Sequence, residues 1–82
     1  MYIHVGGEKI VRTSEIIAIF DISIDHSSKI SKQFLLQAKE RKETDYIGED
    51  EAKSIVVTKD KVIYSPISSA TLKKRTHHFS AL

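Results

Sequence analysis

The chain has 82 residues, of which 40% are hydrophobic, and it contains no cysteine. This length predicts a single domain over residues 1–82 with a thin core. The missing thiols exclude a disulfide framework, a cysteine nucleophile and a thiolate zinc site. Thirteen basic and eleven acidic side chains give a net charge of +2. The placement of charge, rather than its total, therefore has to decide whether the protein binds a polyanion.

The beginning of the chain, MYIHVGGEK, has no basic segment followed by a long apolar run, so it does not resemble a secretory signal. No apolar stretch approaches the roughly 18 residues of a membrane span. The absence of cysteine fits a reducing compartment. These features predict a cytoplasmic protein with no membrane partner.

The first elements in chain order are predicted to be strands. Apolar and polar residues alternate in YIHV at 2–5, and Gly6 and Gly7 adopt positive φ at no steric cost, so residues 2–11 predict a β-hairpin. Residues 15–24 are rich in β-branched and aromatic side chains. We predict a central strand there, buried on both faces, although the pattern alone also fits a buried helix.

Residues 25–42 change to a helical period. Ile30, Phe34 and Ala38 lie four residues apart and Leu35 widens the stripe, which predicts a helix with one apolar face. Ser27 or Ser28 is a candidate N-cap.

The second half of the chain predicts a loop, a hairpin and a helix. Residues 43–52 are acidic and without period, which predicts a loop, and 53–58 and 61–65 predict a second hairpin. Pro66 ends the strand, and Ser68 or Ser69 can cap a short helix over 69–76, followed by a flexible tail that contains His77 and His78. The order β-β-β-α-β-β-α predicts an α+β fold.

No motif for catalysis or metal binding is present. His77 and His78 are adjacent and point in different directions, and His4 and His26 have no clear geometric relation to them. The chain lacks G-x-S-x-G, G-x-G-x-x-G and the P-loop. We therefore predict that the protein is not an enzyme and holds no metal or cofactor.

Two further groups of residues have side chains of types that bind ligands. Glu49, Asp50 and Glu51 lack the ligand spacing of a calcium loop, so we interpret them as a solvated acidic segment. Tyr46 and Tyr64 could stack on bases, but as isolated tyrosines beside strand residues they are interpreted as packing groups at the edge of the core.

Basic side chains are concentrated in the two predicted helices. Lys73, Lys74 and Arg75 lie in a segment, 70–82, that has no acid, and residues 29–42 hold five cations against Glu40 alone. Compensation of the helix dipole and a solvated surface would explain these cations without a partner. A phosphate-contacting surface would explain them equally, and its few contacts would gain affinity if an oligomer repeated them along one DNA. The sequence leaves both interpretations open.

Four stretches together resemble a known family. These are MYIHVG at the start, IFD at 19–21, KSIVVT at 53–58 and YSPISSATLKKR at 64–75. The chain is similar to the bacterial extracellular matrix regulatory proteins, the RemA/RemB family, and more so to the RemB branch. The resemblance implies a cytoplasmic transcriptional regulator of biofilm matrix genes with a fold similar to LytTR-type DNA-binding domains. The RemA branch further implies ring-shaped oligomers that wrap DNA on an outer basic rim.

The chain departs from the RemA pattern at the arginines that contact DNA. Aligned on SIVV, the arginine pair falls on Asp50 and Glu51, a third arginine falls on Lys53, and a further rim arginine falls on Glu15. Carboxylates repel phosphates, so the RemA binding mode does not transfer to this chain.

We predict a transcriptional regulator that binds double-stranded DNA through a different basic surface and forms a homo-oligomer, for which a ring is one arrangement. The candidate DNA-binding residues are Arg12, Lys53, Lys73, Lys74 and Arg75, and the candidate oligomer interface is Glu49, Asp50 and Glu51, which could meet a neighbour's basic helix head to tail. High salt should weaken such an assembly. The alternative is an interaction subunit that does not bind DNA and regulates through a paralogous DNA-binding protein.

Overall fold

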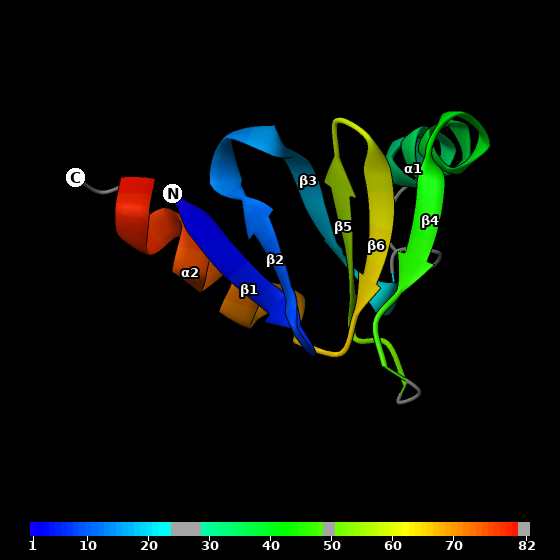
Figure 1. The fold of residues 1–82 in the computed structure, drawn as a ribbon. Coiled ribbons are helices and arrows are strands. Elements are labelled where there is room, and N and C mark those ends of the chain that lie inside the picture. The colour runs from blue at the N-terminus through cyan, green and yellow to red at the C-terminus, as the bar shows by residue number, and fades with distance from the viewer. Residues whose placement is uncertain (24–28, 49–50, 81–82) are drawn as a thin grey trace.

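The computed structural model describes the backbone of residues 1–23, 29–48 and 51–80, and the side chains of these residues as far as Thr76. Two strands form a small sheet, and four strands form a larger sheet (Figure 1). In chain order the elements are β1 Tyr2–Gly6, β2 Lys9–Arg12, the 3-10 turn η1 Thr13–Glu15, β3 Ile16–Asp21, α1 Lys29–Arg41, β4 Glu43–Tyr46, β5 Ser54–Thr58, β6 Lys61–Ser65 and α2 Ser69–Ser80. The predicted α+β class is confirmed, and similarity to LytTR-type domains stays a prediction.

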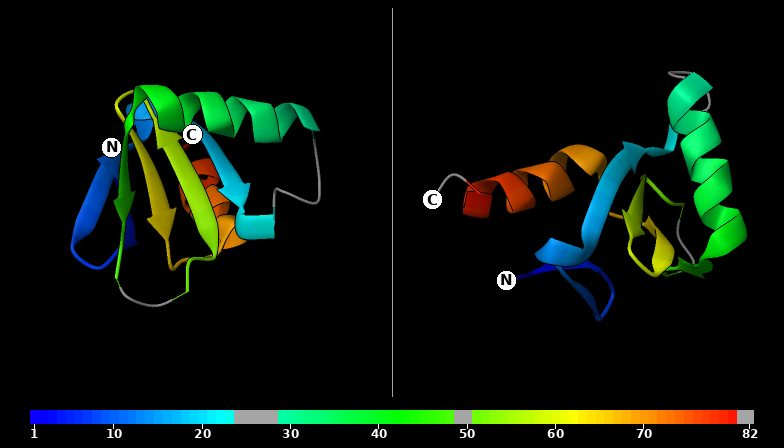
Figure 2. Two further views of the ribbon diagram at one scale, coloured as in Figure 1. Left: turned by 90° about the vertical axis from the view of Figure 1, so that its right-hand side faces the viewer. Right: turned by 90° about the horizontal axis from the view of Figure 1, so that it is seen from above.

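The four-stranded sheet has the order β3-β5-β6-β4 and separates two layers. β3, β5 and β6 pair antiparallel, whereas β4 runs parallel to β6. The β1-β2 hairpin and α2 lie on one side of this sheet and α1 lies on the other (Figures 1 and 2). Alternation along β5 therefore sends successive side chains into two different cores.

Each core takes alternate residues from β5 and β6. Val56 and Ile63 face the hairpin and α2, where they pack with Val5 and Leu72. On the opposite face the buried residues come from α1, β5 and β6, namely Leu35, Ala38, Ile55, Val57 and Val62. All five residues of β5 are buried. The strand is covered on both faces, and its three central residues are accordingly all apolar and β-branched, with Ser54 and Thr58 at its ends.

The first hairpin is confirmed, and Gly6 is required at its turn. Gly6 has φ +122 and Gly7 has φ +56, values that side chains strongly disfavour. A Cβ on Gly6 would also lie 2.8 Å from Cδ of Pro66, at the end of β6. The turn of the hairpin is thus held close to the large sheet. The hydroxyl of Ser65 adds a hydrogen bond to the carbonyl oxygen of Val5.

The prediction of a central strand at 15–24 is wrong in its position. β3 is an edge strand, and Ile17 is 51% exposed, whereas β5 and β6 are the two inner strands. β3 is apolar because helices partly cover both of its faces: Phe20 packs on Phe34 of α1 with ring centroids 6.0 Å apart, and Ser69 of α2 reaches Asp21. An apolar run in a strand indicates that both faces of the strand are covered, but it does not indicate where the strand lies in the sheet.

The prediction of a loop over 43–52 is wrong for Glu43–Tyr46, which form β4. This strand follows α1 almost directly and pairs with β6 at the edge of the sheet. None of the four residues of β4 is buried, and Glu43 and Tyr46 are exposed, so this strand needs few apolar side chains. The sequence ETDY therefore carries no apolar alternation by which a strand could be recognised.

The helices begin near their predicted positions but differ in detail. α1 is confirmed, although Ile30 is 80% exposed, so the predicted apolar face packs only through later turns. The proposed caps Ser27 and Ser28 lie outside the described residues. α2 has its predicted cap, since the Ser68 hydroxyl accepts a hydrogen bond from the backbone N–H of Thr71 at 3.2 Å.

α2 is longer than predicted. It extends through Ser80, so the backbones of His77 and His78 are helical and the prediction that they lie in a tail is wrong. The sequence THHFS has no glycine or proline to end the helix at Thr76.

Candidate nucleic-acid interface

The cations of α2 take their directions from one buried leucine. Leu72 is 0% exposed and fixes the side of the helix that faces the core. With about 100° of rotation per residue, Lys74 lies nearly opposite Leu72, and Lys73 and Arg75 lie on the two flanks. In agreement with this geometry, Lys73 and Lys74 are exposed and Arg75 is half-buried.

Arg75 and Arg12 both contact β1. Nη1 of Arg75 donates a 2.7 Å hydrogen bond to the backbone oxygen of His4. Arg12 donates a 3.0 Å hydrogen bond to the Tyr2 hydroxyl, and its guanidinium lies 5.5 Å from the centre of that ring. These contacts raise the pKa of Arg12, with a smaller contribution from the charge of Glu15. Both arginines are therefore positioned by the protein itself, and Arg12 also has an acid nearby.

Lys73 lies on the other flank of α2, close to a carboxylate at the end of β3. The pKa of Asp21 is lowered chiefly by hydrogen bonds from the hydroxyl and backbone N–H of Ser23, at 2.7 and 2.9 Å. Ser69 and the charge of Lys73 lower it further. Asp21 was not singled out from the sequence, and it reduces the positive potential on this side of α2.

Lys53 is exposed at the same end of the large sheet. Its backbone oxygen accepts from the N–H of Ile22, the residue after β3, at 3.1 Å. Lys53 therefore lies near the C-terminal end of β3, which α2 also contacts through Ser69 and Asp21.

Three of the five candidate residues thus lie on α2, and the other two lie outside it, so they do not form one tight cluster. We call them the α2 surface: Arg12, Lys53, Lys73, Lys74 and Arg75. Lys73 and Lys74 are its exposed centre, Lys53 extends it at the beginning of the helix, and Arg12 and Arg75 border it along β1. Glu15 lies beside Arg12 and Asp21 beside Lys73, so acids offset part of the positive charge of this surface.

α1 presents its cations differently. Lys39 donates a 2.8 Å hydrogen bond to the hydroxyl of Tyr64, and Lys42, just beyond the helix, donates a 2.7 Å bond to the backbone oxygen of Thr58. Tyr64 also stacks on Tyr46, with ring centroids 4.7 Å apart. The two tyrosines are therefore not isolated, because they stack on each other and Lys39 contacts Tyr64. The prediction of packing at the edge of the core is confirmed for Tyr64.

The proposed oligomer interface stays a prediction. Glu49 and Asp50 lie outside the described residues, and Glu51 is exposed.

The residues that the structure does describe contain no group of three or more histidine and acidic side chains that could hold a metal ion. No helix among them is long and apolar enough to cross a membrane.

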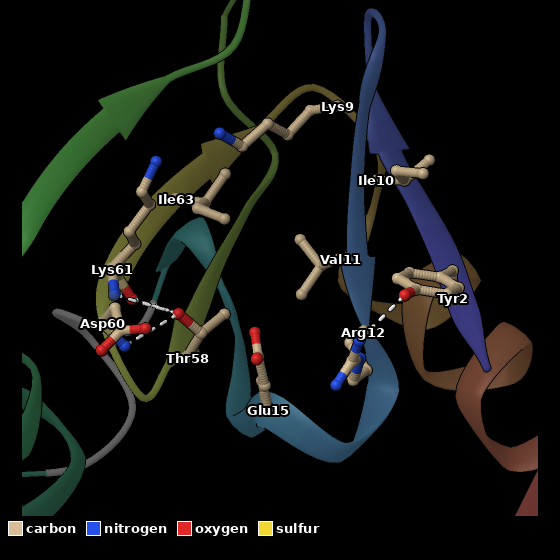
Figure 3. A pocket seen from close by; sticks show the side chains of 10 residues that line it. All are labelled: Tyr2, Lys9, Ile10, Val11, Arg12, Glu15, Thr58, Asp60, Lys61 and Ile63. Carbon is tan, nitrogen blue, oxygen red and sulfur yellow. Dashed lines mark hydrogen bonds between the residues drawn. The ribbon is translucent and has the colours of Figure 1, made fainter.

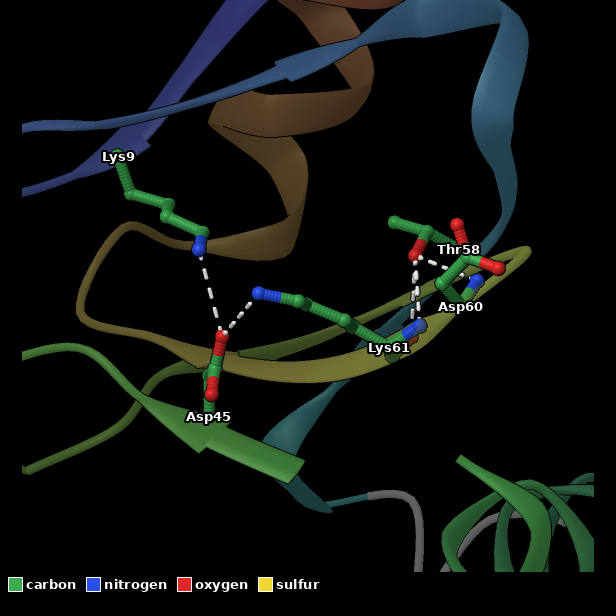
Figure 4. A network of polar contacts seen from close by, with 5 residues as sticks. All are labelled: Lys9, Asp45, Thr58, Asp60 and Lys61. Carbon is green, nitrogen blue, oxygen red and sulfur yellow. Dashed lines mark hydrogen bonds and ion pairs between the residues drawn. The ribbon is translucent and has the colours of Figure 1, made fainter. Parts of the chain in front are cut away.

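Sequence reasoning missed one charged network that joins the two sheets (Figure 4). Oδ2 of Asp45 lies 3.3 Å from Nζ of Lys9 and 3.2 Å from Nζ of Lys61, so β4 binds both β2 and β6. Hydrogen bonds from Lys61 and then from Lys9 lower the pKa of Asp45. The network could not be predicted because residues 43–46 were interpreted as a loop.

Comparison with known proteins gives the family. The sequence profile of the RemA-like family, described as Extracellular matrix regulatory protein A-like, matches residues 2–76. The chain belongs to this family of extracellular matrix regulatory proteins, which confirms the resemblance seen in the sequence. It is 44% identical over 75 residues to Extracellular matrix regulatory protein B of Bacillus subtilis (strain 168). The aligned region covers 92% of this chain and 89% of that relative. The names of the family and of the relative describe regulation and do not describe catalysis.

Proposed function

We propose that this protein is a transcriptional regulator of extracellular matrix genes that binds double-stranded DNA through the α2 surface. It acts in the cytoplasm as a homo-oligomer, without a cofactor and without catalytic activity. Family membership supports the regulatory role. The DNA-binding mode rests on the geometry of α2.

One observation carries the proposal. α2 spans Ser69–Ser80, so Lys73 and Lys74 lie in the middle of the helix. The favourable effect of the helix dipole on cations is limited to the last turn, so it does not account for these two lysines. Both are exposed on the side of α2 that faces away from the core. Two lysines in this position are suited to phosphate contacts, and an oligomer would repeat them along one duplex.

The proposal is tested by fluorescence anisotropy with a labelled AT-rich duplex at several salt concentrations. We expect saturable binding that weakens as salt rises, and loss of binding in Lys73→Glu/Lys74→Glu. The matched control is Lys29→Glu/Lys32→Glu, which reverses two exposed cations of α1 and should retain most of the affinity. Light scattering checks that each variant keeps its assembly. An intact oligomer that fails to bind at about 50 mM salt would contradict direct DNA binding.

A second candidate function is supported by the acids. Glu15 lies beside Arg12, Asp21 lies beside Lys73, and Arg75 is bound to β1, so only part of the α2 surface is available to phosphates. In this case the protein is an interaction subunit that regulates through a paralogous DNA-binding protein. Failure to bind DNA alone, together with binding in the presence of the paralogue, would favour it.

A further inference from the structure

A groove of about 370 Å³ lies between the β1-β2 hairpin and the β5-β6 turn (Figure 3). Its volume is within the range of ligand sites in proteins. Val11 of β2 and Ile63 of β6 point toward one another from its two walls and form an apolar floor. None of the candidate DNA-binding residues except Arg12 lines it.

One wall of the groove is the open edge of β2. The small sheet contains only β1 and β2, so the outer side of β2 has no partner strand among the described residues. The backbone N–H of Thr13 donates to the oxygen of Met1 at 2.9 Å. Hydrogen-bonded pairs alternate in an antiparallel ladder, so Ile3 and Val11 form the next such pair. The N–H and C=O of Ile10 and the N–H of Arg12 therefore point away from β1, toward the groove.

No described residue outside the hairpin forms a backbone hydrogen bond with these three groups. A strand edge with unpaired backbone groups beside an apolar floor is the geometry by which proteins bind extended peptides. The side chain of Ile10 is exposed, so the edge is not covered from that side.

The two ends of the groove carry opposite charge. At one end Lys9 and Lys61 line the groove, whereas the acids beside them, Asp45 (Figure 4) and Glu43, are not among its lining residues. At the other end Arg12 lies near Glu15, and Asp60 also lines the groove, which leaves one negative charge in excess.

We propose that the open edge of β2 binds an extended peptide segment of a partner protein by strand addition. The segment carries an apolar residue that enters between Val11 and Ile63. Side chains of a strand alternate between its two faces, so the charged residues lie two positions away on either side: an acid toward Lys9 and Lys61, and a base toward Glu15 and Asp60. This peptide site is separate from the exposed lysines of α2, so it does not depend on the proposed DNA binding.

The test uses two labelled heptapeptides with blocked termini, TETVTKT and its reverse TKTVTET. The two sequences cover the two directions, parallel and antiparallel to β2, in which the peptide can add to the edge. Each is titrated into the full chain and followed by fluorescence anisotropy. We expect saturable binding of one of them, preferred over the other. An N-methyl group on alternate peptide nitrogens should abolish binding, because it removes donors that pair with the edge.

Protein variants locate the site. Ile10→Pro removes a backbone N–H that lies outside the β1-β2 ladder, so the hairpin can form while the affinity for the peptide falls about five- to tenfold. Lys9→Gln should weaken binding about two- to fivefold. Lys59→Gln is the matched control. Lys59 is exposed on the β5-β6 turn beside the groove but does not line it, so this substitution should leave the affinity for the peptide unchanged.

Amide hydrogen exchange supplies a readout on the unmodified protein. Exchange at Ile10 and Arg12 should slow when the peptide binds. The proposal is overturned if neither peptide binds, if the N-methylated peptide binds equally well, or if protection appears only at α2. Protection of the Ile10 amide that rises with protein concentration in the absence of peptide would also overturn it, because a second copy of the chain would then cover the edge.

Discussion

α1 and α2 are both rich in lysine and arginine, yet they use these residues differently. In α2 a fully buried leucine holds the helix to the core, and Lys73 and Lys74 project into water. α1 leaves Ile30 and Leu36 exposed, while Lys39 donates a hydrogen bond to the protein. The number of cations in a helix therefore does not identify a binding surface. What identifies it is the direction that packing gives to each cation and the partners that it already has.

The largest effect expected from this comparison is on stability. Leu72→Ala should lower the free energy of unfolding by about 3 kcal/mol, because it leaves a cavity between α2 and both sheets. Leu36→Ala removes the same atoms from a side chain that is 54% exposed and should cost less than about 0.5 kcal/mol. Urea denaturation of both variants measures the difference. Equal losses would contradict the burial of Leu72 and the exposure of Leu36.

A smaller effect separates two neighbouring cations of α2. Arg75→Gln removes the hydrogen bond to the oxygen of His4 and should lower the free energy of unfolding by about 1 kcal/mol. Lys74→Gln should change stability by less than about 0.5 kcal/mol while weakening DNA binding. Thermal unfolding and anisotropy on the same samples give the two values. If Lys74→Gln were the more destabilising variant, Lys74 would have a structural role that the geometry does not show.

The smallest effect concerns the Lys9–Asp45–Lys61 network. Its carboxyl has a lowered pKa in the folded protein, so it contributes stability above the carboxyl pKa of the unfolded chain, and this contribution is lost as the pH falls through the folded pKa. The side chains are about a third exposed, and solvent screening therefore limits the effect to less than about 1 kcal/mol.

Asp45→Asn tests this network. The variant should be slightly less stable than the parent protein at pH 7, and the difference should disappear in strong acid, where Asp45 is protonated. Urea denaturation at a series of pH values measures it. A difference that persists unchanged in acid would show that the charge of Asp45 contributes nothing.

Element types were predictable from the sequence where burial produces a pattern. The hairpin at Gly6 and Gly7, the buried strand around Val56 and the helix at Leu35 each have a period or a turn signal in the sequence, and each was confirmed. Strand order was not predictable, because the apolar run of β3 reflects cover by both helices and not a central place in the sheet.

The charged contacts were less predictable than the fold. Lys73 and Lys74 could be named from their segment, but the partners of the cations depend on distant residues: Arg75 on His4, and Lys9 on Asp45 of a strand that has no apolar signal. The contact of Arg12 with Tyr2 follows from the register of the hairpin, and a closer analysis of that turn could have predicted it.

The most direct test of the account is the salt dependence of DNA affinity, compared between α2 and α1. If α2 contacts the phosphates of DNA, the logarithm of the binding constant falls linearly with the logarithm of salt concentration. Lys73→Gln/Lys74→Gln should make this slope shallower by about 0.9 for each phosphate contact removed, while Lys29→Gln/Lys32→Gln should leave it unchanged. An unchanged slope in the α2 variant, or a loss confined to the α1 variant, would contradict the assignment of the DNA-binding surface to α2.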